Sequence, residues 1–363
     1  MKINKIRLRN FRNYENVEVK FDDKLNIIIG DNAQGKTNLL ESIYVLAVTK
    51  SFLSIHDKNL IKSNCKYSLI EGDLYKNGDL INLNILFNEK GKVVKVNNKE
   101  IKKISDYISL MNVVIFSSDS IRIFKDSPGS RRKYFNIQIS QINRKYLKLL
   151  SDYNTILRQR NEFLKIININ KKSDIDYLDI IDDKYIDLSL SIYNFRKEYI
   201  DKINKYLFDI YKSITMYDNL KLNYVSNVED DKEVFKDKLR KNLNKEIMYK
   251  MTLIGPNRDD FYFSLDNKNM SLYGSQGQIR SAVLALKLSE VKIFNDVTND
   301  EPILLLDDLF SELDVIKRNN ILKYLDKDIQ TIITTTDINN INNNLKEKGK
   351  VWEIKDGKLF PGK

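Results

Sequence analysis

A glycine-rich segment near the start of the chain has the spacing of a phosphate-binding loop. The segment reads GDNAQGKT and fits the pattern G-x-x-x-x-G-K-[S/T], between an apolar run that predicts a strand and one that predicts a helix. The glycines allow backbone N–H groups to face phosphate oxygens, and the start of the helix adds the positive end of its dipole. Lys36 is expected to reach the β- and γ-phosphates of a nucleotide, and the Thr37 hydroxyl to bind Mg²⁺. The predicted nucleotide-binding residues are Gly30, Asp31, Asn32, Ala33, Gln34, Gly35, Lys36 and Thr37.

Two adjacent carboxylates late in the chain provide the acid groups that phosphate chemistry needs. They end the run ILLLDD, which predicts a buried strand next to the strand that leads into the phosphate-binding loop. Asp307 is the expected second ligand of Mg²⁺, and Asp308 is placed to orient or deprotonate an attacking water. The alternative is a strand that ends in a solvated acidic turn. That alternative is weakened by SELD, which follows at once and contains Ser311, Leu313 and Asp314.

A second glycine-containing segment, SQGQ, opens the amphipathic helix that the apolar spacing predicts from residue 276 to about residue 294. Its residues Ser275, Gly277 and Gln278 form another candidate anion-binding helix start. Serine is also a common N-cap residue, so the segment taken alone is consistent with an ordinary helix start.

The elements that must position these groups divide the chain into three parts. Apolar runs predict strands through most of residues 1–125, with hairpin turns at KNGD and NEKGK. Over 126–250, apolar residues recur every three or four positions, which predicts two long amphipathic helices joined by a polar loop. Strand patterns return over 251–363, in FYFSLDN, MSLYG, PILLLDD and TIITTTD. We expect the two β-rich ends to form one body, with the middle inserted as an antiparallel helical arm or as an ordinary helical subdomain.

The composition restricts the class of protein. With 363 residues, the chain is longer than one compact core usually needs, which favours two structural units. A single cysteine and a single histidine argue against an internal disulfide and against a zinc cluster. No apolar run approaches the roughly 18 residues of a membrane span. We therefore expect a cytoplasmic protein without a membrane partner.

The net charge of +11 has two interpretations. It favours a nucleic-acid partner, and basic clusters occur at 131–133, 144–148 and 236–246. The chain is also rich in Lys, Asn and Ile, a composition that reflects nucleotide bias in many genomes. The clusters are equally consistent with solvated surfaces, so the DNA-contacting residues stay unassigned.

In this order, the four motifs resemble those of the ABC-type ATPases. In that family the S-x-G-Q helix caps the γ-phosphate of a nucleotide bound by a second subunit, so that two heads enclose two ATP molecules. The resemblance implies trans-acting residues Ser275, Gly277 and Gln278, and a D-loop that contains Ser311, Leu313 and Asp314.

Further segments resemble the RecF family, in the SMC branch of these ATPases. They are IRLRNFRNY near the start, SPGSRRKYFN, LIGPNRDDFYF and LLLDDLFSELD. The resemblance implies an α/β fold: a P-loop ABC-type ATPase head with a β-rich N-terminal lobe and an inserted helical arm like a short antiparallel coiled coil. It places the two parts of the head at 1–125 and 251–363 and the arm at 126–250. Two departures are Asn257, where RecF proteins usually have histidine, and Thr336, where transporters typically have a switch histidine.

Membership of the RecF family implies an ATP-dependent DNA-binding protein of recombinational repair, replication restart and the SOS response. We expect a weak ATPase that uses ATP and Mg²⁺ and does no chemistry on DNA. Its ATP-bound homodimer is expected to bind single-stranded or gapped DNA and, with RecR and RecO, to help load RecA.

The main alternative is the ATPase subunit of a membrane transporter, which the helical insertion and the missing switch histidine disfavour. The short arm disfavours an SMC-like structural protein, and a non-catalytic ATP-gated scaffold stays open.

Overall fold

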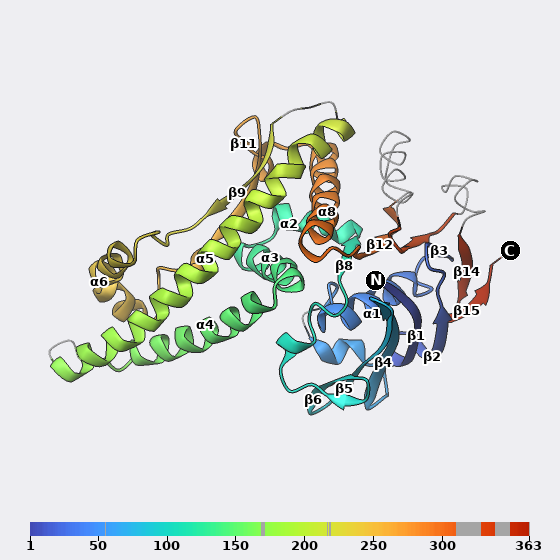
Figure 1. Cartoon of the computed structure of the whole chain (residues 1–363), viewed down its shortest axis with the longest axis horizontal. Helices are drawn as coiled ribbons and strands as arrows, with labels where there is room; N and C mark the ends of the chain where they lie inside the picture. Colours follow the sequence, from blue (N-terminus) through green and yellow to red (C-terminus); the bar gives the residue numbers. More distant parts are fainter. Residues whose placement is uncertain are drawn as a thin grey trace. The chain divides into compact units, whose positions relative to one another are not determined.

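The computed structural model describes residues 1–54, 56–167, 171–215, 217, 219–309, 328–337 and 349–362 (Figure 1). The chain forms two compact units. Unit 1 is built from 1–122, 209–217 and 276–363, and unit 2 from 123–208 and 218–275.

The first sheet of unit 1 is mainly parallel and buried. Its strands run in the order β15 (Lys358–Pro361), β14 (Lys350–Lys355), β3 (Leu25–Ile29), β13 (Thr331–Thr335), β12 (Ile303–Asp307) and β8 (Val113–Phe116). The five strands from β14 to β8 are parallel to one another. Strand β15 pairs with β14 in the antiparallel direction. Continuous Val, Ile and Leu runs such as LNIII and ILLLD suit this sheet because both of its faces are covered. The carboxyl ends of β3 and β12 therefore lie at one edge.

The second sheet of unit 1 is antiparallel. Its strands run in the order β2 (Tyr14–Lys20), β1 (Lys2–Phe11), β4 (Tyr67–Lys76), β5 (Asp79–Asn88), β6 (Gly91–Val96) and β7 (Lys99–Glu100). The turn between β4 and β5 has positive φ at both central residues, 52° at Asn77 and 88° at Gly78, as a tight hairpin requires. The hairpin predicted at KNGD is therefore confirmed.

Helix α1 (Lys36–Val48) contacts strands of both sheets in unit 1, including β12 and β13 on one side and β4 and β5 on the other. Its sequence is apolar around most of its circumference, and residues from Leu39 to Val48 are buried. Helix α8 (Gln276–Thr298) packs against β8 and the 3₁₀ turn Ser118–Ile121. The remaining 3₁₀ turns are Asp57–Leu60, Ile104–Asp106 and Pro256–Arg258.

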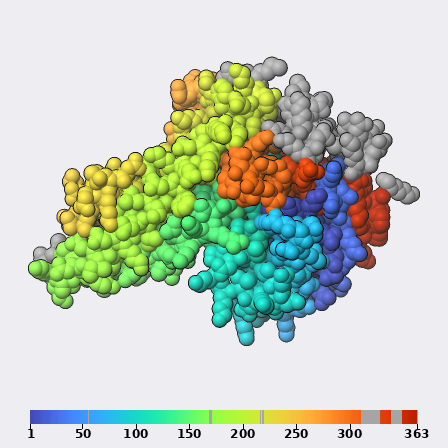
Figure 2. Space-filling model, in the orientation of Figure 1, coloured from blue at the N-terminus to red at the C-terminus, as the bar shows by residue number. Residues whose placement is uncertain are grey.

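Unit 2 is mostly helical. Its elements are α3 (Pro128–Ile142), α4 (Arg144–Phe163), most of α5 (Lys172–Thr215), β9 (Leu220–Val225), α6 (Lys232–Tyr249), β10 (Asp260–Leu265), β11 (Lys268–Asn269) and α7 (Met270–Tyr273), and the short α2 (Arg122–Lys125) leads into it. Helices α4 and α5 lie side by side and antiparallel (Figure 1), and the space-filling view shows no opening between them (Figure 2). Ring contacts join Tyr153 to Tyr185 and Phe163 to Tyr177. The predicted pair of long amphipathic helices is present.

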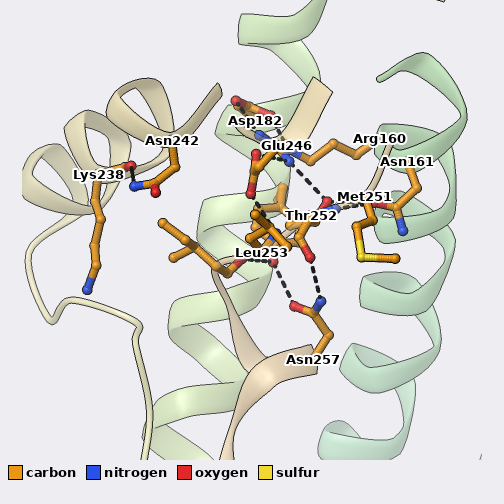
Figure 3. Close-up of polar contacts among 12 residues, drawn as sticks. Arg160, Asn161, Asp182, Lys238, Asn242, Glu246, Met251, Thr252, Leu253 and Asn257 are labelled. Atoms are coloured by element: carbon orange, nitrogen blue, oxygen red, sulfur yellow. Dashed lines mark hydrogen bonds and ion pairs between the residues drawn. The ribbon is translucent and has the colours of Figure 1, made fainter. Parts of the chain in front are cut away.

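Two buried arginines hold the helices of unit 2 to the loop before β10. Arg160 of α4 donates to Asp182 of α5 (2.6 Å), Glu246 of α6 (2.6 Å) and Thr252 (3.0 Å), as Figure 3 shows. Arg196 of α5 pairs with Asp259 and donates to the Pro256 carbonyl. Both guanidinium groups are almost fully buried, so these ion pairs act where water cannot screen them.

Sequence expectations differ from the structure at four places. One is strand β9, which lies within the region 126–250 that was expected to be helical. Strand β12 is not next to β3, because β13 lies between them. The segment MSLYG contains a helical turn, α7, where Asn269 caps Ser271, and only β11 before it is extended. Residues 251–275, placed in the C-terminal head from sequence, group with unit 2, because β10 pairs with β9 and Phe261 packs on Phe135.

No helix in the described ranges combines the length and apolar character that crossing a membrane requires.

Candidate nucleotide-binding site

The segment from Gly30 to Gly35 forms a tight loop between β3 and α1. A Cβ atom at Gly30 would lie 2.6 Å from the carbonyl oxygen of Ile354. Gly35 has a φ of 115°, and a Cβ atom there would lie 2.5 Å from Asn13 Nδ2. Both positions therefore need glycine. The Lys36 ammonium folds back over the loop and donates to the carbonyls of Gly30 (2.6 Å) and Asp31 (2.9 Å).

Residues outside the motif hold this loop from behind. The Tyr14 hydroxyl donates to the Gly35 carbonyl (2.9 Å), and Asn13 Nδ2 donates to the Gln34 carbonyl (3.0 Å). The side-chain oxygen of Gln34 accepts the backbone N–H of Asp356 in the β14–β15 turn (2.6 Å). Asn13 and Tyr14 belong to the FRNY segment, which the sequence marks only through its family resemblance.

The acidic pair lies at the same edge of the sheet as the loop. The Thr37 hydroxyl lies 3.0 Å and 2.9 Å from the two carboxylate oxygens of Asp307, across 270 residues of sequence. Asp307 is almost buried, and burial raises its pKa, while hydrogen bonds from Thr334 and Thr37 oppose that rise. Burial lowers the pKa of Lys36, while Asp308, Asp307 and Asp31 oppose that change. The structure thus brings together Lys36, Thr37 and Asp307.

A threonine that the sequence analysis missed completes this corner. The Thr334 hydroxyl of β13 lies 2.7 Å from Asp307 Oδ1, and the Asp308 N–H donates to it at 3.0 Å. The run TTT at the carboxyl end of a buried strand is the local signal for this residue, but from the sequence it indicates only that a switch histidine is missing.

The loop and its neighbours fit a nucleotide phosphate and a magnesium ion. Gly30 and Gly35 leave no room for a side chain, so the backbone can approach a phosphate closely. The N-cap residue of α1 is Gly35, so no side chain caps the first N–H groups of the helix, which can then bind an anion. Lys36 supplies positive charge. Thr37 and Asp307 are hard oxygen donors in mutual contact, the kind of ligand that Mg²⁺ prefers.

The SQGQ segment lies at the start of α8, as expected. Ser275 and Gly277 are exposed and Gln278 is half-buried, and a Cβ atom at Gly277 would point into open space beyond its own turn of helix. One chain does not test action on a second subunit, so the trans role stays a prediction. The predicted D-loop residues Ser311, Leu313 and Asp314 lie outside the described residues.

Two of the basic clusters are engaged by acids of unit 2 itself. Arg131 binds Asp260 through two nitrogens, each at 2.7 Å. Three pairs join α6 to α5 in antiparallel register: Lys232–Asp187, Lys236–Asp183 and Arg240–Asp179, at 2.6, 2.7 and 3.5 Å. For Arg131, Lys236 and Arg240, these ion pairs favour an internal structural role over a DNA contact. Lys145 and Lys148 of the third cluster are exposed on α4.

Comparisons with known proteins agree with this geometry. The family described as RecF/RecN/SMC N terminal domain matches residues 2–357. The chain is 38% identical over 365 aligned positions to the DNA replication and repair protein RecF of Listeria innocua, covering 98% of this chain and 99% of the relative. It is 36% identical to the RecF protein of Staphylococcus aureus, covering 99% and 100% of the two chains.

Solved structures place the fold in the same group. The structure of the recombination mediator protein RecF with ATP, in the RecFOR pathway, superposes with a TM-score of 0.92 at 32% identity, covering 100% of this chain and 98% of the other. An SMC head domain from Pyrococcus furiosus, at 14% identity, shares the fold with a TM-score of 0.54. The predicted P-loop ABC-type ATPase head is confirmed, and the match is not to a membrane transporter. The chain belongs to the RecF family of DNA replication and repair proteins.

Proposed function

We propose that this chain binds ATP with Mg²⁺ at the phosphate-binding loop, and that bound ATP joins two copies of the chain. The observation that carries the first half is the contact of Thr37 with Asp307 beside the folded Lys36 side chain. When bound, Mg²⁺ supplies positive charge next to the β- and γ-phosphate oxygens. Thr37 and Asp307 would hold it, and Lys36 would exchange its loop carbonyls for phosphate oxygens.

We assign the hydrolytic role to Asp308, the residue after the proposed metal ligand Asp307. Asp308 orients or deprotonates the attacking water, as a carboxylate beside the phosphate site can do. We propose slow turnover, because Asp308 is shorter than the glutamate common in the wider class and Thr336 replaces a switch histidine. Such an ATPase uses nucleotide binding and loss to time a conformational cycle.

The joining of two copies is assigned to the SQGQ segment and the D-loop. Ser275, Gly277 and Gln278 would complete the nucleotide site of the partner copy, and the exposure of the first two is consistent with this. A ligand that bridges two subunits stabilises the dimer by mass action. The head would then contain 1–122 and 276–363. The D-loop residues Ser311, Leu313 and Asp314 would lie near the partner.

We further propose that the ATP-bound dimer binds single-stranded or gapped DNA and acts with RecR and RecO to help load RecA, in the cytoplasm. Support comes from relatives that are DNA replication and repair proteins and from a solved relative described as a recombination mediator of the RecFOR pathway. The net charge of +11 is consistent with a DNA partner.

Mixing two inactive variants tests the trans arrangement. Lys36→Met keeps its SQGQ segment but is expected to lose ATP binding, and Ser275→Arg keeps its loop but is expected to lose the trans contact. A mixed dimer would contain one complete site, so the mixture should hydrolyse ATP faster than either variant alone. No gain on mixing, with each variant folded and Ser275→Arg still binding ATP, would contradict the trans role. Loss of ATP binding by monomeric Ser275→Arg would contradict it as well.

A further inference from the structure

Thr334 lies where three elements of the candidate site meet. It is fully buried on β13, and it pairs in register with Ile28 of β3 on one side and Asp307 of β12 on the other. The phosphate-binding loop follows β3, so Thr334 is the middle position between the loop strand and the acidic strand. Its hydroxyl is therefore placed to act on the acids from within the sheet.

The hydrogen bonds of this hydroxyl have a defined direction. It carries one hydrogen, and its nearest acceptor is Asp307 Oδ1 at 2.7 Å, much closer than the Leu306 carbonyl at 3.4 Å. Its lone pairs accept the Asp308 N–H at 3.0 Å. A chain of hydrogen bonds thus runs from the Asp308 backbone through Thr334 to the Asp307 carboxylate. Hydrogen bonds to a charged acceptor are the stronger kind.

This chain fixes an uncommon backbone conformation at Asp308. The φ of Asp308 is 49°, in the left-handed region that residues other than glycine rarely adopt. The Asp308 N–H is held by the Thr334 hydroxyl and also lies 3.2 Å from the Thr334 carbonyl oxygen. Thr334 therefore controls two neighbouring acids at once: the carboxylate of the first and the backbone of the second.

The other contact of Asp307 has a different expected fate. Thr37 and Asp307 touch each other directly, so a cation held by both would replace their hydrogen bond. Thr334 is not among the proposed metal ligands, and its bond to Asp307 Oδ1 can persist. We propose that Thr334 is a positioning residue that holds Asp307 in place for Mg²⁺ and Asp308 in place for the attacking water. This inference rests on the roles proposed above for those two acids.

The test compares three substitutions in the full chain. Thr334→Val removes the hydroxyl and keeps the shape, Thr334→Ser restores a hydroxyl, and Thr331→Val is the matched control at the other end of the same strand. Thr331 is equally buried, and within the described part of the chain its hydroxyl hydrogen-bonds only the Ile329 carbonyl, at 3.3 Å. The readouts are the affinity for ATPγS in EDTA, the Mg²⁺ concentration that gives half-maximal tightening of that binding, and kcat and KM for ATP.

For Thr334→Val we expect unchanged affinity in EDTA, a higher half-maximal Mg²⁺ concentration, and a kcat lower by about ten- to a hundredfold, the loss typical of one hydrogen bond to a charged group. Thr334→Ser and Thr331→Val should stay within about threefold of the unmodified chain, the spread expected for a single substitution that preserves these contacts. Thr334→Val behaving like Thr331→Val, or Thr334→Ser failing to restore both readouts, would overturn the inference.

Two further outcomes are distinguishable. If Thr334→Val does not fold, Thr334→Ala and Thr334→Ser are compared, and the same difference between hydroxyl and no hydroxyl decides the question. If the unmodified chain shows no effect of Mg²⁺ on nucleotide binding, the proposed function itself fails, and the role of Thr334 fails with it.

Discussion

Replacing Arg160 with methionine should destabilise unit 2 by about 3–5 kcal/mol, the cost typical of leaving buried charges without their partner. Arg160 is fully buried, and its guanidinium binds Asp182 and Glu246, which are themselves almost inaccessible (Figure 3). Methionine fills much of the same volume but donates no hydrogen bond. The variant would therefore bury two carboxylates with no counter-charge, rather than create a large cavity.

The size of this effect should depend on pH. Burial raises the pKa of Asp182 and of Glu246, and Arg160 opposes that rise in both. Without Arg160 the two pKa values rise further. A carboxyl group whose pKa is raised on folding favours the folded state below its unfolded pKa, about 4, and this contribution is lost as pH rises through the folded pKa. The penalty in Arg160→Met should therefore be smallest near that pH and grow towards neutral pH.

Urea unfolding, followed by circular dichroism and by tryptophan fluorescence, separates the stability of unit 2 from that of unit 1. The chain has one tryptophan, Trp352, which lies on β14 of unit 1, whereas most of the long helices that dominate circular dichroism belong to unit 2. Arg160→Met should shift the circular dichroism transition and leave the tryptophan fluorescence transition almost unchanged. Arg158→Met, on an exposed position of the same helix, is the control and should shift neither. A dichroism shift of less than about 1 kcal/mol at neutral pH would refute the reasoning.

Two other predictions follow from the site and the helices. Asp308→Asn should bind ATP as tightly as the unmodified chain but lose at least about a hundredfold in kcat, because it removes the acid–base group and not the phosphate contacts. An affinity for ATPγS that falls as much as kcat would contradict this. Lys236→Ala together with Arg240→Ala should not change the salt dependence of DNA binding, because both side chains pair with aspartates of α5. A reduction in the log–log slope of affinity against salt would show that they contact phosphates instead.

The sequence was sufficient for the parts of the site that depend on local spacing. The phosphate-binding loop needs its glycines where the backbone approaches Ile354 and turns at positive φ, and these requirements are visible as G-x-x-x-x-G. The strand ILLLD and the helix from Gln276 are likewise evident from their apolar patterns. The motifs also identified the family, which the comparisons confirmed.

What sequence reasoning missed depends on strand order and on distant pairing. Nothing local shows that β13 lies between β3 and β12, and without that order Thr334 has no visible role. Strand β9 was hidden within a helical region because its identity depends on pairing with the distant strand β10, in which Phe261 lies opposite Tyr224. The basic cluster at 236–246 was ambiguous for the same reason, since its aspartate partners lie on α5.

The central claim is that ATP bound by one copy is completed by the SQGQ segment of another. The most direct measurement is the solution mass by light scattering of the unmodified chain and of Lys36→Met, with and without ATP and Mg²⁺. We predict that ATP doubles the mass of the unmodified chain, further promoted by gapped DNA, and leaves Lys36→Met at the mass of one chain. A mass that does not respond to ATP, or a Lys36→Met variant that dimerises equally well, would contradict the claim.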